Sequence, residues 1–253
     1  MSSHPRSFKR GSSMIKPRLK GKVALITGGN RGIGLAIAKA LAAEGCKLII
    51  TGRDQSALNK ATKALSRFKV EVLSVVCDVR DAVDVGALFA TVEGHFHRLD
   101  ILINNAGISQ PGLSVQKLPL QTWKDVIDIN LTGTFLVTQT ALPLMKRGSI
   151  IVNNLSVAAK QVFVNSSAYN ASKHGALGFT NSLREELREK GIRVIALLPG
   201  ATDTDIWNLL WPDAPRQKMM SPETVAAALV NALTLAENST VEELTIRPSI
   251  GSL

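Results

Sequence analysis

Cysteine is scarce in this sequence: Cys46 and Cys77 are the only two among 253 residues. Two isolated cysteines do not make a disulfide framework, and they would pair only if the fold brought them together. A reducing compartment explains this usage simply, so we expect a cytoplasmic protein. The four histidines show no ligand spacing with cysteines or acids, so we predict no metal site.

Long apolar runs are also missing, although 45% of the residues are hydrophobic. No window approaches the roughly 18 uninterrupted apolar residues that a membrane-spanning helix needs, so we expect no membrane association. Beyond the first 20 residues there is no low-complexity stretch, internal repeat or linker-like segment. We therefore predict that residues 21–253 form one domain with a full hydrophobic core.

Acidic residues are missing from the first 20 positions, which carry six lysines and arginines among several serines. We predict that residues 1–20 form a basic, disordered extension. It lacks the apolar core of a secretory signal peptide, and an organelle-targeting segment remains an alternative. The remainder has 24 basic and 20 acidic residues, so most of the net charge of +10 lies in this tail. We therefore expect an enzyme with a polyanionic cofactor and no nucleic-acid partner.

From residue 22 onward, short β-branched runs alternate with helical patterns. Strands are expected at Val23–Thr27, Lys47–Thr51, Glu71–Val76, Ile101–Asn104, Ser149–Asn154, Arg193–Leu198 and Glu243–Ile246. Helices are expected at Ile33–Glu44, Gln55–Ser66, Val83–His95, Trp123–Met145, Tyr169–Glu189 and Pro222–Ala236. This alternation predicts an α/β fold: a single-domain, Rossmann-type, doubly wound parallel sheet of about seven strands with helices on both faces.

A glycine-rich turn, Thr27-Gly28-Gly29-Asn30-Arg31-Gly32-Ile33-Gly34, leads from the first strand into the first helix. Glycine at 28, 32 and 34 permits positive φ, close approach of the backbone to a pyrophosphate, and tight packing of helix on strand. The unpaired N–H groups of the helix then face the phosphates. The glycines alone would also suit a plain turn, but the TGxxxGxG spacing favours a dinucleotide site, with Asn30, Arg31 and Ile33 beside the glycines.

The end of the second strand predicts which dinucleotide binds. NAD requires a carboxylate there for the ribose 2′-hydroxyl, whereas NADP requires an arginine for the 2′-phosphate. The strand-end position is Gly52, and Arg53 follows it directly, with Arg31 on the neighbouring turn. Asp54 could supply the carboxylate, but it also fits the N-cap of the next helix, which we favour. The sequence therefore predicts NADP (NADPH), with NAD less favoured.

Two more strand ends carry polar residues. Asp78-Val79 follows the third strand, where the carboxylate could accept a hydrogen bond from an adenine amino group or cap the next helix; both interpretations stay open. Asn104-Asn105-Ala106-Gly107 ends the fourth strand. The asparagines can tie neighbouring strand ends together, and Ala106 and Gly107 leave room for a cofactor.

Tyr169 is the only tyrosine in the chain, and Lys173 lies four residues later on the same predicted helix. Side chains at this spacing project side by side. An ammonium beside a phenol favours the phenolate, which would make Tyr169 a usable proton donor or acceptor. Ser156, 13 residues earlier, follows an apolar strand that should deliver it to the edge of the sheet.

Together these motifs resemble the short-chain dehydrogenase/reductase family over about residues 20–200. The matching parts are the loop Thr27 to Gly34, the NNAG segment Asn104 to Gly107, the helix asparagine Asn130, the set Ser156, Tyr169 and Lys173, and the PGxxxT segment with Pro199, Gly200, Thr202 and Thr204. Val157 departs from the small or hydroxylated residue often found after the serine. The C-terminal pattern of acyl-carrier-protein reductases is also missing, which leaves the substrate unassigned.

The resemblance implies an NADPH-dependent reductase of a ketone or aldehyde. By resemblance, Tyr169 is the general acid/base, Lys173 lowers its pKa and holds the nicotinamide ribose, Ser156 hydrogen-bonds the carbonyl, and Asn130 supports a proton relay through water. The PGxxxT segment lies beside the nicotinamide. The family also implies a homodimer or homotetramer. A catalytically silent, nucleotide-sensing protein of the same fold is the alternative.

Three segments are expected to wall the substrate pocket: 108–118, 157–167 and 200–220. Their side chains include Leu113, Val157, Val162, Phe163, Trp207, Leu210 and Trp211. The same segments contain few basic residues, among them Lys117, Lys160 and Arg216. Such a wall favours an apolar or aromatic carbonyl compound over a small charged acid. The long segment 200–220 could be a substrate lid or could pack on the core.

Overall fold

The computed structural model describes residues 19–236 and 238–251, so nearly all of the predicted N-terminal extension, residues 1–20, lies outside it. All seven predicted strands are present in one parallel sheet of order β3-β2-β1-β4-β5-β6-β7. The strands are β1 Val23–Thr27, β2 Lys47–Gly52, β3 Val72–Val76, β4 Ile101–Asn104, β5 Ile150–Asn154, β6 Arg193–Pro199 and β7 Glu243–Ile246. The predicted fold class is confirmed.

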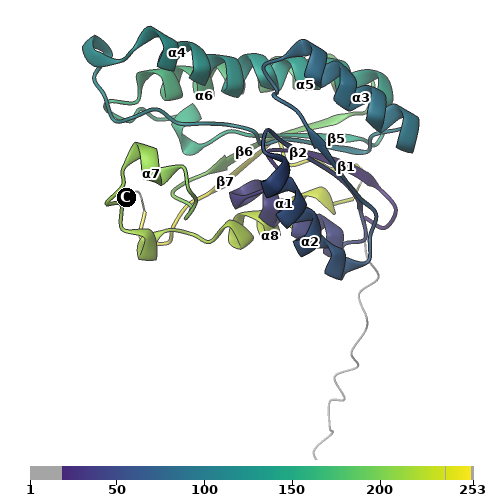
Figure 1. Cartoon of the computed structure of the whole chain (residues 1–253). Helices are drawn as coiled ribbons and strands as arrows, with labels where there is room; N and C mark the ends of the chain where they lie inside the picture. Colours follow the sequence, from purple (N-terminus) through teal and green to yellow (C-terminus); the bar gives the residue numbers. More distant parts are fainter. Residues whose placement is uncertain (1–18, 237, 252–253) are drawn as a thin grey trace, which may run out of the picture.

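Helices cover both faces of the sheet, as Figure 1 shows. One layer holds α1 Gly32–Ala43, α2 Gln55–Leu65 and α8 Pro222–Leu233, and the other holds α3 Ala82–Phe96, α4 Leu120–Ile127, α5 Gly133–Ala141 and α6 Ser167–Arg188. None of the described helices is long and apolar enough to cross a membrane.

The sheet separates two hydrophobic cores because its strands are apolar on both sides. In β1, Ala24 and Ile26 pack with α1, α2 and α8, while Val23 and Leu25 pack with α3, α5 and α6. Alternate residues of a strand point to opposite faces, so one short apolar run contributes to both cores. This explains why the strands could be predicted from continuous apolar runs.

The order of the strands reverses at β1. The chain passes from β1 outward to β2 and β3, then returns to pair β4 on the other side of β1. The two connections leave the sheet in opposite directions, which opens a crevice at the carboxyl ends of β1 and β4. The glycine turn and the predicted strand-end residues all lie at this end of the sheet.

The predicted helix at residues 123–145 was wrong in one respect. The structure has α4, then a π-helical turn at Asp128–Thr132, then α5 and a 3-10 turn at Leu142–Leu144. A Cβ on Gly133 would approach Val79 to 2.7 Å, so this part of the helix lies tightly against the end of β3. A π turn accommodates one extra residue, a local change that an average apolar period does not reveal.

The segment 200–220 is not a structureless loop. It contains α7 Trp207–Leu210 and a 3-10 turn at Arg216–Lys218, and its two ends meet in a parallel bridge between Thr202 and Met220. The bridge ties the segment beside the carboxyl end of β6. Its apolar side chains are described with the site below.

Gly34 gives a test of the packing of α1 on the glycine turn. A Cβ on this residue would overlap the carbonyl oxygen of Gly28 and the side-chain amide of Asn105. We expect Gly34→Ala to lower the free energy of unfolding by about 3 kcal/mol, measured by urea denaturation. The matched control is Gly86→Ala in α3, where a Cβ meets nothing within 4 Å. That change should gain up to about 1 kcal/mol, and equal effects at both sites would contradict the packing argument.

Candidate active site

A cavity of about 990 Å³ lies at the carboxyl ends of the strands. Nearly all the predicted site residues line it: Gly28, Asn30, Arg31, Gly32, Ile33, Gly34, Arg53, Asp78, Val79, Asn105, Ala106, Gly107, Ser156, Tyr169, Lys173, Pro199, Gly200, Thr202 and Thr204. Asn130 is the exception, since it lies behind the wall. Segments that are far apart in the sequence therefore face one space.

Hydrogen bonds from the end of β4 fix the backbone conformation of the glycine turn. Gly28 and Gly32 have φ of 62° and 52°, a region that favours glycine. The Asn105 amide donates to the carbonyl oxygens of Thr27 (2.8 Å) and Gly28 (3.1 Å). The N-cap residue of α1, Arg31, makes no side-chain hydrogen bond to the first turn, and the first residues of the helix line the cavity. Uncapped N–H groups of a helix suit an anion such as a phosphate.

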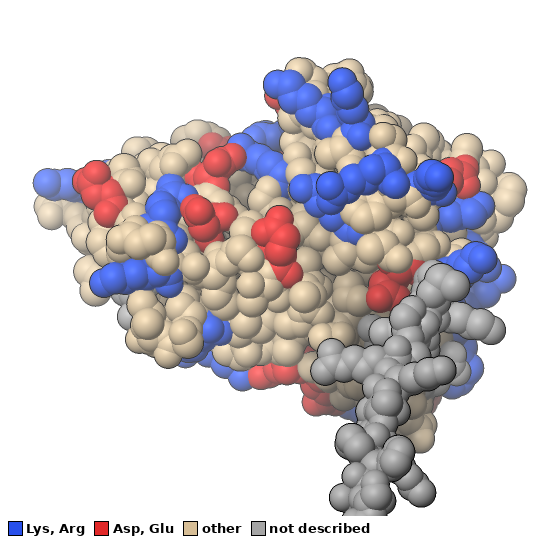
Figure 2. Space-filling model, turned by 90° about the horizontal axis from the view of Figure 1, so that it is seen from below, with Lys and Arg blue, Asp and Glu red and all other residues tan. Residues whose placement is uncertain are grey.

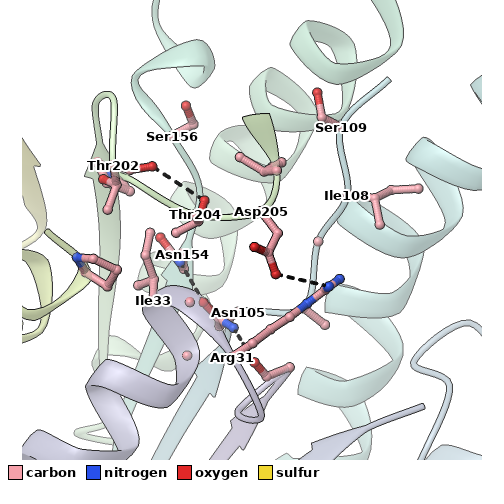
Figure 3. A pocket seen from close by; sticks show the side chains of 18 of the residues that line it. Arg31, Ile33, Asn105, Ile108, Ser109, Asn154, Ser156, Thr202, Thr204 and Asp205 are labelled. Carbon is pink, nitrogen blue, oxygen red and sulfur yellow. Dashed lines mark hydrogen bonds and ion pairs between the residues drawn. The ribbon is translucent and has the colours of Figure 1, made fainter. Parts of the chain in front are cut away.

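The end of β2 offers cations and no carboxylate of its own. The Asp54 carboxylate accepts from the N–H groups of Ser56 and Ala57 at 2.8 and 3.2 Å, so its predicted role as a helix N-cap is confirmed. The Arg53 side chain is 58% exposed and lies 3.9 Å from Asp78, while Arg31 lies 3.5 Å from Asp205 across the cavity (Figure 3). Both guanidinium groups remain accessible to an incoming anion.

The surface around this end of the cavity is basic. Helices α1 and α2 carry Lys39, Lys60 and Lys63 and no acidic residue. In Figure 2, which views the molecule from the side of these helices, lysines and arginines gather over a broad part of the surface. Such a surface raises the local concentration of an anionic ligand, and salt weakens the effect.

Asp78 is engaged by a neighbouring arginine. Arg80 donates to both of its carboxylate oxygens, at 2.6 to 3.1 Å, and these bonds hold the pKa of Asp78 below its usual value. The N-cap of α3 is Asp81, whose carboxylate accepts from Val83 N–H at 2.8 Å. The interpretation of Asp78 as the helix cap was therefore wrong, because the helix begins three residues later.

Asparagines join the ends of β1, β4 and β5, as the sequence predicted. The Asn154 amide donates to Asn105 at 2.8 Å, and Asn104 donates to Asn153 at 2.8 Å (Figure 3 shows the first pair). Asn154 was not predicted as a site residue, although it lines the cavity. Its backbone carbonyl accepts from Lys173 Nζ at 3.2 Å, so it also holds the lysine.

Ser156, Tyr169 and Lys173 meet at one wall of the cavity. Ser156 follows β5, and its hydroxyl accepts from Ala158 N–H at 3.1 Å. Lys173 Nζ lies 5.6 Å from the centre of the Tyr169 ring, one helical turn away on α6. The ammonium has one hydrogen-bond acceptor among the described residues, the Asn154 carbonyl, which leaves donor capacity directed to a ligand.

Burial dominates the electrostatics of this trio. It raises the pKa of Tyr169 above its ordinary value, and a hydrogen bond with Ser156 opposes the shift without cancelling it. Burial also lowers the pKa of Lys173 to about 8. The expectation that Lys173 lowers the tyrosine pKa was therefore wrong for the free protein, because desolvation disfavours both the phenolate and the ammonium.

Asn130 lies in the π turn, where it does not line the cavity but is hydrogen-bonded to a residue that does. Its side-chain oxygen accepts from Ile108 N–H, and its amide donates to the Ile108 carbonyl, both at 2.9 Å. The amide also donates to Ser172 Oγ at 3.0 Å. The segment after β4 is thus bound to α6 through this one side chain.

Part of the predicted substrate wall is present. Val157, Phe163, Trp207, Leu210 and Trp211 line the cavity. The predicted wall residues Leu113 and Val162 do not line it, and neither do the basic residues Lys117, Lys160 and Arg216.

The segment 200–220 lines the cavity and is also fastened within the subunit. The Trp207 indole donates to the Thr202 carbonyl at 2.8 Å. Arg216 donates to the Asp203 carboxylate at 2.9 Å and to the Thr204 carbonyl at 2.7 Å. Lys160 forms an ion pair with Glu243. Arg216 and Lys160, which could otherwise bind a charged substrate, are therefore already engaged by the protein.

Gln110 was missed by the sequence analysis. It is fully buried, and its oxygen accepts from the N–H groups of Ala168 (2.7 Å) and Tyr169 (3.1 Å). These contacts span 58 and 59 residues, and no local pattern marks a glutamine for such a role.

Known proteins resemble this chain along most of its length. Residues 22–214 match a family model described as short chain dehydrogenase. An uncharacterized oxidoreductase of Staphylococcus haemolyticus is 34% identical over 232 residues, which cover 91% of this chain and 98% of the relative. A putative ketoacyl reductase of Streptomyces coelicolor is 38% identical over 208 residues, covering 76% and 79%. A short chain dehydrogenase from Burkholderia cenocepacia, crystallised in complex with NADP, has a TM-score of 0.84 at 32% identity, covering 91% and 98%.

The buried lysine predicts how stability depends on pH. The pKa of Lys173 falls from 10.5 to about 8 on folding, so the charged lysine destabilises the fold fully below about pH 8, and this cost disappears as the pH rises toward 10.5. We expect Lys173→Met to be more stable than the wild type at pH 7 by about 1–3 kcal/mol, with the difference shrinking by pH 10. Urea denaturation of the ligand-free proteins at both pH values measures it. A difference that does not change with pH would contradict the assignment.

Proposed function

The chain belongs to the short chain dehydrogenase family, and from this premise we propose that it is an NADP(H)-dependent oxidoreductase that reduces a ketone or aldehyde to the alcohol, reversibly. The observation that carries the proposal is the shared cavity: Ser156, Tyr169 and Lys173 face the same space as the glycine turn. The NADP complex of the Burkholderia relative supports the choice of cofactor.

The residues present fit a dinucleotide. The uncapped N-terminus of α1 and the positive-φ glycines provide a cradle for phosphates, and Gly34 leaves no room for a side chain there. Arg31 and Arg53 would hold a 2′-phosphate, and Lys173 would hold ribose hydroxyls. Asp78, Val79, Asn105, Ala106 and Gly107 would surround the rest of the adenosine and ribose, and Pro199 to Thr204 the nicotinamide. When bound, the cofactor supplies the hydride.

The protein's own contribution is to hold the carbonyl compound and to move one proton. Tyr169 Oη gives its proton to the carbonyl oxygen during reduction and takes it back during oxidation. A raised pKa keeps the phenol protonated at neutral pH, as reduction requires. Ser156 hydrogen-bonds the carbonyl oxygen and the phenol. Asn130 supports a relay of protons through water by fixing the wall at Ile108.

Removing the phenol hydroxyl tests the mechanism. We expect Tyr169→Phe to lower kcat for carbonyl reduction by at least about 100-fold, since general acid catalysis typically contributes this much. The dissociation constant for NADPH, measured by fluorescence titration, should change less than about twofold, which excludes a collapsed site as the cause. Near-wild-type turnover in this variant would refute Tyr169 as the acid.

A catalytically silent, nucleotide-sensing protein remains the alternative function. The complete set of Asn130, Ser156, Tyr169 and Lys173 favours the enzyme, because a lost site would be expected to lose a member. A panel of ketones, aldehydes and quinones, monitored by NADPH oxidation, separates the two. Tight NADPH binding with no oxidation across the panel would favour the sensor.

Arg53 predicts the preference for the phosphorylated cofactor. We expect Arg53→Gln to weaken NADPH binding by about 1–3 kcal/mol, the scale of a hydrogen bond to a charged group, and to leave NADH binding almost unchanged. Lys60→Gln on α2 is the matched control, because it removes the same charge from an exposed residue outside the cavity. Equal affinity of the wild type for NADPH and NADH would overturn the preference.

The apolar wall supports an apolar or aromatic carbonyl compound as substrate. Trp211 is 44% exposed at the mouth of the cavity, beside Leu209 and Leu210. We expect kcat/KM to rise with substrate hydrophobicity, and Trp211→Ala or Trp207→Ala to lower it about tenfold for apolar substrates. Trp211→Phe, which keeps an apolar ring, is the control and should lose less. A preference for small hydrophilic acids would defeat this assignment.

We also propose a homodimer or homotetramer that acts in the cytoplasm, with residues 1–20 as an extension of a single domain, 21–253. Leu120, Trp123 and Phe135 are exposed on α4 and α5, where a partner would cover them. On α6, a Cβ at Gly178 would meet nothing within 4 Å, whereas Gly175 packs against Leu131 of the same subunit. The small residues of α6 thus serve both internal packing and an open face.

A further inference from the structure

Helix α6 begins without a cap of its own. Its N-cap residue, Ser166, makes no side-chain hydrogen bond to the first turn. The first intrahelical bond runs from Asn170 N–H to the Ser166 carbonyl at 2.8 Å, so the preceding N–H groups need other acceptors. This matters because Tyr169 is the third residue of the helix and lies in the turn that lacks the cap.

Gln110 supplies the missing acceptor from another part of the chain. Its side-chain oxygen accepts from Ala168 N–H at 2.7 Å and from Tyr169 N–H at 3.1 Å. Its amide donates to the Asn165 carbonyl at 3.1 Å, just before the helix. With all of these contacts made by a side chain that is 0% exposed, water cannot readily replace them.

The backbone carbonyl of Tyr169 is also fixed, through a chain of hydrogen bonds that leads back to the same segment. Ser172 Oγ donates to the Tyr169 carbonyl at 2.8 Å and accepts from the Asn130 amide at 3.0 Å. Asn130 in turn makes two hydrogen bonds with Ile108, two residues before Gln110. The segment 108–110 therefore fixes both the N–H and the C=O of Tyr169.

We propose that Gln110 is a positioning residue for the reaction: as a remote cap of α6, it keeps the Tyr169 hydroxyl beside Ser156 and at the cavity wall. The effect on turnover rests on the proposed function, whereas the effect on Tyr169 itself does not. Without this cap the first turn of α6 would fray, and the phenol would move relative to Ser156 and Lys173.

Three variants separate positioning from general stability. Gln110→Met removes the acceptor and keeps the shape of the side chain. Gln110→Glu keeps an oxygen that both N–H groups can reach, and in its protonated form it also keeps a donor for the Asn165 carbonyl in this buried site. Asp81→Ala is the matched control, because it removes the same kind of cap, with bonds to two N–H groups, from α3, which carries no catalytic residue.

We expect Gln110→Met to lower kcat at least tenfold while KM and the NADPH dissociation constant change less than threefold. Gln110→Glu should restore kcat to within about fivefold of the wild type. Asp81→Ala should lower the melting temperature and leave kcat within twofold. Should Gln110→Met fail to fold, Gln110→Asn, which keeps the amide but shortens its reach, takes its place with the same expected loss.

A second measurement is independent of activity. Because Tyr169 is the only tyrosine in the chain, the ultraviolet absorbance of ionised tyrosine reports this residue alone. We expect fraying in Gln110→Met to hydrate the phenol and lower its pKa toward the ordinary value of about 10, with faster amide hydrogen exchange at Ala168 and Tyr169. An unchanged titration and unchanged exchange would overturn the proposal. If the wild type reduces no carbonyl compound, the proposed function fails while this test still decides the role of Gln110.

Discussion

The site depends on the junction of β1 and β4, where the sheet reverses its order. Beyond the paired residues of these strands, backbone groups would be left without partners, and buried unpaired groups are costly. Thr27 and Asn105 take these positions. The Thr27 hydroxyl accepts from the N–H groups of Asn105 (2.9 Å) and Ala106 (3.0 Å), while the Asn105 amide serves the carbonyls of the glycine turn. The two side chains thus continue the sheet as the strands diverge, and the cavity opens above them.

The charged groups at the two ends of the cavity differ in burial, and therefore in how much they destabilise the folded protein. Near Arg53 and Arg31 the charged groups are exposed and weakly paired, so they cost the folded protein little. Lys173 is only 6% exposed, and among the described residues its ammonium has a single carbonyl acceptor, so it destabilises the free protein. A ligand that offered further acceptors to this ammonium would relieve that cost. Binding is therefore linked to the stability of α6 through one side chain.

The sequence predicted what depends on local chemistry. Continuous apolar runs marked the five inner strands, which are largely buried on both faces, whereas the edge strands β3 and β7 are only partly buried. The turn residues marked the crevice where they cluster. The sequence analysis failed where a contact joins residues that are well separated in the sequence. Gln110 caps a helix 58 residues away, and Arg216 folds back on Asp203. The direction of the Tyr169 pKa was also missed, because desolvation depends on everything packed around the residue.

The π turn at Asp128–Thr132 has a consequence for the register of the chain. An α-helix advances by roughly 100° per residue, so one additional residue within a turn rotates all that follows by about this angle. The apolar faces of α4 and α5 are consequently out of phase, and no single helical wheel describes both. Deleting one residue here would give a more regular helix, yet it would turn Gly133 away from Val79 and carry Asn130 off Ile108. The π turn therefore allows one continuous helical segment to contact both Val79 and Ile108.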